Sequence, residues 1–170
     1  MYTRFAKFFY FLSIGLFLFV FLYAYASMPD FATYEQNSKG LPVKQLSKES
    51  FFYFTVILFF VYNVLLVIPG KMIEMKGRNA LRRLFPVGDI YRDRILAWIY
   101  SFIGVLNLCV SIMVFYIHSL TNQNEIRNSE YNVFFYLVPI LLAAWVIGLF
   151  LLLVGKMKQV KQVQFKADNS

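Results

Sequence analysis

"FFYFTVILFFVYNVLLVIPG", residues 51–70, contains no charged side chain. A helix rises 1.5 Å per residue, so a run of this length can cross a hydrocarbon core about 30 Å thick. A strand of a membrane barrel would instead alternate polar and apolar residues. The run therefore predicts a membrane-spanning helix.

Three further uncharged runs have a similar length, and together the four predict spans at about 8–27, 51–70, 95–118 and 131–155. The chain of 170 residues is 59% hydrophobic and only 15% charged, which is far from the composition of a soluble domain. We therefore expect an all-α integral membrane protein, in which residues 1–170 form a single four-helix bundle.

The basic residues predict the orientation of the chain, because lysines and arginines are retained on the cytoplasmic side. Thirteen of the 17 lie at the N-terminus, in the 71–94 loop and in the 156–170 tail, whereas the 28–50 and 119–130 loops hold four. Both termini are thus expected to be cytoplasmic. The net charge of +8 follows from this threading and does not indicate nucleic-acid binding.

The first predicted span has two interpretations. Ala24, Tyr25 and Ala26 resemble the cleavage site of a signal peptide. The uncharged stretch before this site is long enough to span, which favours an uncleaved helix. Cleavage stays an alternative and would leave three helices.

The predicted spans contain amides and hydroxyls but no charged residue, so the usual marks of proton relays and ion-coupled transporters are missing. Asn63 and Asn107 lie at similar depths in the second and third spans and are expected to hydrogen-bond across them, with Ser111 as a further candidate for an interhelical polar contact. The bond is either a packing contact or part of a polar cavity that holds a small ligand or a conduction path. One helical stripe of the third span, expected to face protein, contains Ala97, Tyr100, Gly104, Asn107, Ser111, Val114 and His118.

Small residues predict close helix packing. Gly104 belongs to the stripe of the third span, and Ala144, Gly148 and Gly155 recur at steps of four and seven in the fourth. Such an edge lets a neighbouring helix approach closely, within the chain or in a second copy.

The sequence offers no recognisable catalytic or cofactor site. His118 is the only histidine and Cys109 the only cysteine, and neither a catalytic triad nor a phosphate-binding glycine loop is present. We expect no enzymatic activity, no metal and no cofactor, although a ligand or proton-exchange role for His118 stays open.

The cytoplasmic loop "KGRNALRRLFPVGD", residues 76–89, predicts a short amphipathic turn from Asn79 to Phe85. Arg78, Arg82 and Arg83 are its candidate contacts to anionic lipid headgroups or to a partner subunit.

The outer loop has a turn signal at Asn37–Gly40 and a serine that can cap the second span. Its order of Met28-Pro29-Asp30, Gly40-Leu41-Pro42 and Lys48 resembles small bacterial multi-pass proteins that carry the domain of unknown function found in the Sdp toxin-immunity protein. Phe31-Ala32-Thr33-Tyr34 departs from that pattern, which has a proline and a histidine there. The resemblance implies a bacterial inner-membrane protein with an uncleaved first helix, and no functional residue is carried over from it.

Three functions are compatible with these features. The first is a non-catalytic subunit or accessory factor that packs against a membrane-protein partner or a second copy in the lipid bilayer. The second is a small transporter or channel component with a path along Asn63 and Asn107. The third, immunity to a membrane-active peptide, is implied by the resemblance alone.

Overall fold

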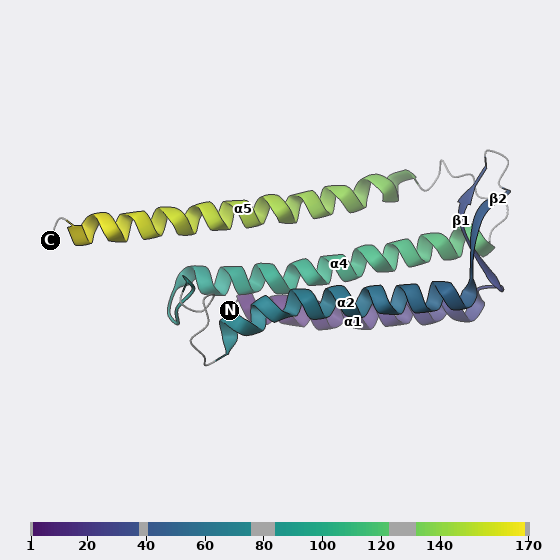
Figure 1. Ribbon diagram of the computed structural model, residues 1–170, viewed down its shortest axis with the longest axis horizontal. Coiled ribbons are helices and arrows are strands. Elements are labelled where there is room, and N and C mark those ends of the chain that lie inside the picture. The colour runs from purple at the N-terminus through teal and green to yellow at the C-terminus, as the bar shows by residue number, and fades with distance from the viewer. Residues whose placement is uncertain (1, 38–40, 76–83, 123–131, 169–170) are drawn as a thin grey trace.

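The computed structural model describes residues 2–37, 41–75, 84–122 and 132–168. Within these ranges four long helices make up most of the chain: α1 (Tyr2–Ser27), α2 (Lys48–Glu74), α4 (Ile90–Asn122) and α5 (Asn132–Asp168) (Figure 1). Each contains a segment that is long and apolar enough to cross a membrane. The prediction of four helices of membrane-spanning length is confirmed.

The helices extend beyond the predicted spans, as α1 begins at Tyr2 and α5 continues to Asp168. Hydropathy marks only the part of a helix that lies in hydrocarbon, whereas flanking basic residues can stay helical at the headgroups. Both termini lie at one end of the molecule (Figure 1). We call this the basic end, because Lys7, Lys71, Arg92 and Lys156 gather there, and the opposite one the hairpin end.

A β-hairpin in the outer loop was not predicted. Strands β1 (Phe31–Gln36) and β2 (Pro42–Ser47) pair antiparallel, with Thr33 opposite Gln45. Asn37 N donates to the Leu41 carbonyl at 2.9 Å, whereas residues 38–40 of the predicted turn lie outside the described residues. The Ser47 side chain accepts a hydrogen bond from Ser50 N and caps α2.

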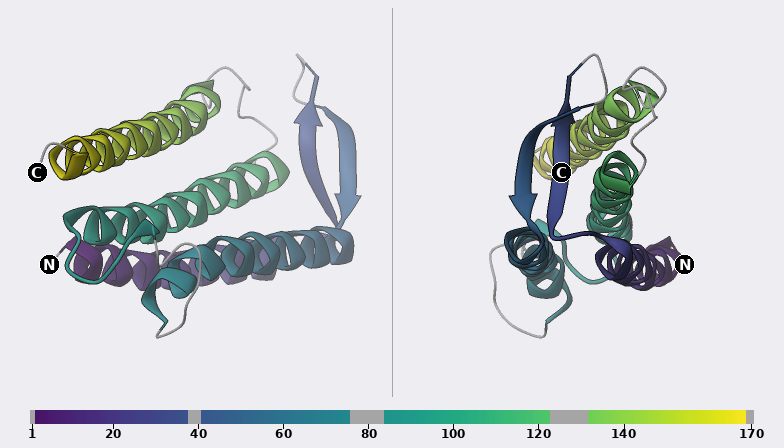
Figure 2. Two further views of the ribbon diagram at one scale, coloured as in Figure 1. Left: turned by 60° about the vertical axis from the view of Figure 1, so that its left-hand side comes forward. Right: turned by 90° about the vertical axis from the view of Figure 1, so that its right-hand side faces the viewer.

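An isolated two-stranded hairpin is marginally stable in water, and here the end of α4 supports it. Thr33 N donates to Thr121 Oγ1 at 2.9 Å, and Gln36 Nε2 donates to the Leu120 carbonyl at 2.9 Å. The hairpin is thereby fixed to the end of α4 and stands beyond the ends of α1 and α2 (Figure 2).

Helix α4 lies at the centre of the bundle and contacts the other three long helices. Two groups of buried apolar side chains fill the space around it. The group toward the hairpin end includes Phe17 and Phe59, whose stacked rings lie 4.0 Å apart between centroids. The group toward the basic end includes Ile73, Phe85 and Ile103.

Helix α5 lies at the edge of this arrangement. Among the described residues it packs mainly on α4, and Figure 2 shows it standing apart from α1 and α2. Helices α1 and α2 both pack on α4 and also meet each other through side chains, such as the stacked rings of Phe17 and Phe59, whereas α5 is attached to α4.

Candidate functional site

A polar cluster joins three helices in the middle of the bundle. Asn107 of α4 is fully buried, and its Oδ1 accepts hydrogen bonds from Tyr62 Oη at 2.7 Å and from Asn63 Nδ2 at 2.9 Å, both on α2. Its Nδ2 donates to Ser13 Oγ of α1 at 2.9 Å. We call Ser13, Tyr62, Asn63 and Asn107 the interhelical polar cluster.

Each polar group in the cluster except one has a partner. Ser13 Oγ donates to the Tyr10 carbonyl at 2.7 Å, and Asn63 Nδ2 also reaches the Phe59 carbonyl at 2.9 Å. The exception is Asn63 Oδ1, which is buried and accepts no hydrogen bond among the described residues. A network with this much pairing holds helices together, because an unpaired amide in hydrocarbon would be costly.

The structure brings Asn63 and Asn107 together, but it places Ser111 differently from the expectation. Ser111 Oγ donates to the Asn107 carbonyl one turn earlier on the same helix, so its hydroxyl links no second helix. The predicted stripe of the third span does face protein, since Tyr100, Asn107, Ser111 and Val114 are all buried.

Gly104 lies where α1 approaches α4 closely. A Cβ at this position would fall 2.6 Å from the Phe9 ring, closer than carbon atoms can pack. The predicted packing role of Gly104 therefore corresponds to a contact with an aromatic side chain of α1.

Two tryptophans hold α5 against α4. Trp98 Nε1 donates to the Trp145 carbonyl at 2.8 Å, and Trp145 Nε1 donates to Ser101 Oγ at 3.1 Å. The indole groups are thus paired in an otherwise apolar contact, as buried tryptophans generally require.

The small residues of the fourth span share one side of α5, and two of the three contact α4. A Cβ on Gly148 would be 3.8 Å from Trp98, and one on Gly155 would be 2.8 Å from Tyr91 Oη, so both glycines face α4. Ala144 is exposed. Part of the predicted edge is used within the chain, against aromatic side chains and not against a backbone.

A buried ion pair fixes α5 at the basic end. Lys156 of α5 pairs with Asp89, which precedes α4, and the two side chains are 11% and 4% exposed. Burial raises the pKa of Asp89, but Lys156 and the Tyr91 N–H outweigh it, so the carboxyl pKa lies below its ordinary value. Asp89 therefore stays charged at neutral pH and holds Lys156.

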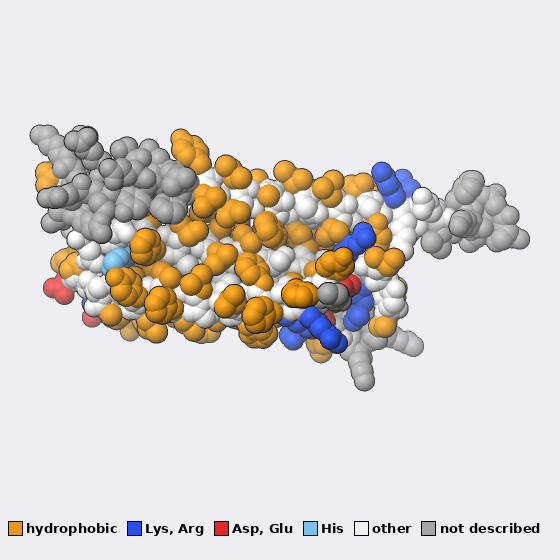
Figure 3. Space-filling view, turned by 180° about the vertical axis from the view of Figure 1, so that it is seen from behind, with side chains coloured by type: hydrophobic (Ala, Val, Ile, Leu, Met, Phe, Trp, Pro, Cys, Tyr) orange, Lys and Arg blue, Asp and Glu red, His pale blue; other side chains and the backbone are white. Residues whose placement is uncertain are grey.

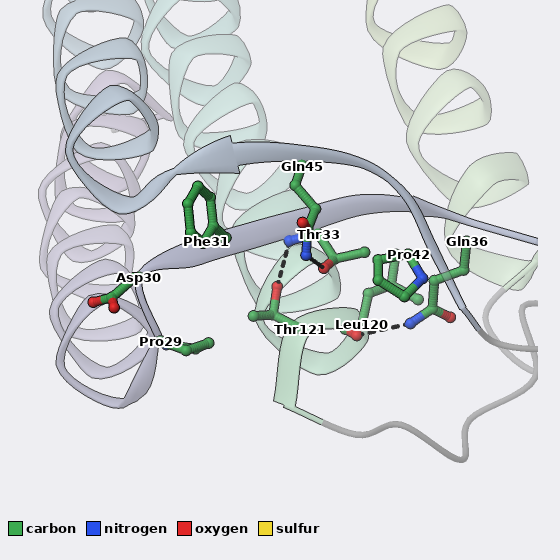
Figure 4. Close-up of a pocket in the computed structure, with 9 residues that line it drawn as sticks. All are labelled: Pro29, Asp30, Phe31, Thr33, Gln36, Pro42, Gln45, Leu120 and Thr121. Atoms are coloured by element: carbon green, nitrogen blue, oxygen red, sulfur yellow. Dashed lines mark hydrogen bonds between the residues drawn. The ribbon is translucent and has the colours of Figure 1, made fainter.

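A pocket of about 290 Å³ lies between the hairpin and the end of α4 (Figure 4). Thr33, Gln45 and Thr121 form one wall, where Gln45 Nε2 donates to Thr33 Oγ1 at 3.2 Å. Among the described residues, Asp30 is the only charged residue of its lining, and none of the others is a histidine or a cysteine. The pocket offers hydrogen bonds but no group of residues that could perform catalysis.

His118 lies at the hairpin end, where its Nε2 is 2.7 Å from Ser27 Oγ and its ring is 5.3 Å from that of Tyr23. It thus links the end of α1 to α4. Cys109 is buried in α4.

Among the described residues, no group of three His, Cys, Asp or Glu side chains could hold a metal ion. Arg78, Arg82 and Arg83 lie outside those residues, as does most of the predicted turn from Asn79 to Phe85. On the face that Figure 3 shows, hydrophobic side chains cover the length of the helices and Lys and Arg gather toward the basic end.

These features define a chain with four helices that are long and apolar enough to span a membrane and with a polar cluster between three of them. Comparison with protein-family models, curated proteins and solved structures finds no match for the chain. The resemblance of the outer loop to the immunity-related family stays a prediction.

Sequence reasoning missed Ser13, Tyr62 and the Asp89–Lys156 pair. Ser13 had a signal, since it is a lone hydroxyl at mid-depth in the first span, where a polar group needs a partner. No feature of the sequence indicated that Asp89 and Lys156 pair, because 67 positions separate them.

Proposed function

We propose that this chain is a non-catalytic accessory or assembly subunit of a larger membrane complex in the bacterial cytoplasmic membrane, with both termini cytoplasmic. The observation that carries the proposal is the position of α5. In a closed four-helix bundle each helix packs against two neighbours, whereas α5 packs mainly against α4.

The side of α5 away from α4 offers a continuous apolar surface. All of its large side chains are exposed: Ile140, Val146, Ile147, Phe150, Leu151, Val154 and Met157. At 3.6 residues per turn these positions share one side of the helix. We call this surface the outer face of α5, and we propose that a transmembrane helix of the partner packs against it.

The polar groups support a structural rather than a chemical role. Apart from Asn63 Oδ1, the polar groups of the interhelical polar cluster and of the Asp89–Lys156 pair find their partners within the chain. Neither presents a nucleophile with an adjacent base, which covalent catalysis needs.

Purification in mild detergent from the native membrane tests the proposal. We expect a stoichiometric partner whose association is lost in Leu151→Trp, because the larger side chain obstructs the outer face. Val61→Trp changes an exposed apolar position on α2 and should leave the complex intact. A homo-oligomer without a second protein would contradict an accessory role.

One observation favours the alternative of a transport path along Asn63 and Asn107, namely the buried Asn63 Oδ1 without a partner. Such an acceptor is suited to a passing ligand or water molecule. On this alternative the purified chain would conduct after reconstitution, and Asn107→Leu would abolish conduction while the protein still folds.

A further inference from the structure

An apolar groove of about 250 Å³ lies between α2, α4 and α5, near the basic end. Leu66 and Ile73 of α2, Trp98 and Ile99 of α4, and Leu149 and Leu153 of α5 line it, and its accessible lining is wholly apolar. The groove exists because α5 attaches to α4 without reaching α2.

The lining of the groove indicates what fits in it. Among the described residues the groove is lined only by apolar side chains, which come from three helices of the chain. It is suited to a narrow, flexible and wholly apolar chain. In a bilayer that description fits a single lipid acyl chain.

The charges at the basic end indicate which class of lipid would supply this acyl chain. Arg92 Nη2 donates to the carbonyl of Ile73, a groove residue, at 3.3 Å. Its Nε is buried without a hydrogen-bond partner among the described residues, and Arg92 forms no ion pair with them. A guanidinium that forms no ion pair among the described residues and lies beside an apolar groove matches a phosphate that carries an acyl chain.

Two neighbouring lysines add positive charge near the groove. Lys71 is exposed on the last turns of α2, where its Nζ lies 3.7 Å from Glu74 Oε2. Lys156, although paired with Asp89, lies 5.8 Å from the ring centre of Phe85, another groove residue. Basic residues at a membrane surface attract anionic lipids.

We propose that this groove binds one acyl chain of an anionic phospholipid, whose phosphate lies at Arg92. The site goes beyond the proposed accessory function and does not depend on it, because it involves neither a partner nor the outer face of α5.

Trp98 provides the readout, since it lines the groove and the chain has only two tryptophans. Trp145→Phe leaves Trp98 as the sole indole and keeps the carbonyl that Trp98 binds. The full chain is reconstituted in phosphatidylcholine vesicles of two kinds. One kind contains a small fraction of phosphatidylglycerol with brominated acyl chains, and the other contains the same fraction of phosphatidylcholine with brominated acyl chains. Bromine quenches an indole only on close contact.

We expect brominated phosphatidylglycerol to occupy the groove about fivefold more readily than brominated phosphatidylcholine, as one basic residue worth about 1 kcal/mol would give. Arg92→Gln should remove this preference, and Arg92→Lys should keep most of it. Arg94→Gln is the matched control, because Arg94 is an exposed arginine two positions further along α4. Equal quenching by both lipids, or a preference that survives in Arg92→Gln, would overturn the proposal.

A second pair of variants tests the groove itself. Leu149→Phe fills the groove and should reduce quenching of Trp98, whereas Leu151→Phe on the exposed side of α5 should not. Unchanged quenching in folded Leu149→Phe would show that the acyl chain lies elsewhere.

Discussion

Asn63 of α2 and Asn107 of α4 share a hydrogen bond of 2.9 Å in the interior of the bundle. The two residues are 44 positions apart, and their bond joins two helices that otherwise meet mainly through apolar side chains. Since lipid tails compete for apolar contacts, a polar bond at this depth favours one arrangement of the helices over others.

Asn107→Leu should destabilise the fold more than any other single change in the interhelical polar cluster. It removes the hydrogen bonds to Ser13, Tyr62 and Asn63 together, at about 0.6 kcal/mol each in a membrane. We expect a loss of about 2 kcal/mol in the free energy of unfolding, measured in mild detergent. Ser111→Ala removes only a bond within α4 and should cost less than half as much; equal costs would argue against the cluster as an interhelical link.

Gly104→Ala should destabilise the contact between α1 and α4 by about 1–3 kcal/mol, because the added methyl overlaps the Phe9 ring. Gly15→Ala is the control, as no atom lies within 4 Å of the position of its Cβ. That change should be neutral or slightly stabilising, since alanine favours a helix. In a Phe9→Ala background, Gly104→Ala should cost little stability, because the overlapping ring is gone. If the cost remains, the added methyl clashes with a group other than Phe9.

The attachment of α5 at the basic end should depend on pH. The folded pKa of Asp89 lies below its ordinary value of 3.8, so its pairing with Lys156 contributes fully above that value and is lost as the pH falls through the folded pKa. Fluorescence transfer between labels on α4 and α5 should therefore stay constant from pH 7 to 5 and fall in stronger acid. Asp89→Asn should abolish this transition. It should also destabilise the attachment of α5 by about 3 kcal/mol at neutral pH, because the substitution leaves the buried Lys156 unpaired. If the transition persists in this variant, a group other than Asp89 causes it.

The predicted threading can be measured with an impermeant thiol reagent. In a Cys109→Ala background, Tyr34→Cys on β1 should react from outside intact cells, whereas Lys158→Cys on α5 should react only after the membrane is opened. Both side chains are exposed in the structure, so lack of reaction reports the membrane and not burial. Reaction of Lys158→Cys from outside would contradict the expected orientation.

The sequence was sufficient to predict the long helices, because an uncharged run such as 51–70 has few alternatives to a helix in lipid. It was insufficient for the hairpin. Neither Phe31–Gln36 nor Pro42–Ser47 alternates cleanly, and the support comes from Leu120 and Thr121, which are more than 80 positions away from β1.

The part of the candidate site formed by rare polar residues within the spans was predictable from the sequence. The part that depends on how the helices pack was not. Two amides at matching depth were enough to predict the bond between Asn63 and Asn107. The edge position of α5 could not be predicted, because the sequence of α5 is apolar on all sides of the helix. Its position depends on Trp145 and Lys156, whose partners lie on α4 or directly before it.

The central claim is that the outer face of α5 binds another membrane protein. Site-specific photo-crosslinking in native membranes tests it most directly, with the crosslinker at Leu151 of α5 and, as a control, at Val61 of α2. The account predicts a protein adduct of one defined mass from Leu151, and only lipid adducts from Val61. Only lipid adducts at both positions would contradict it.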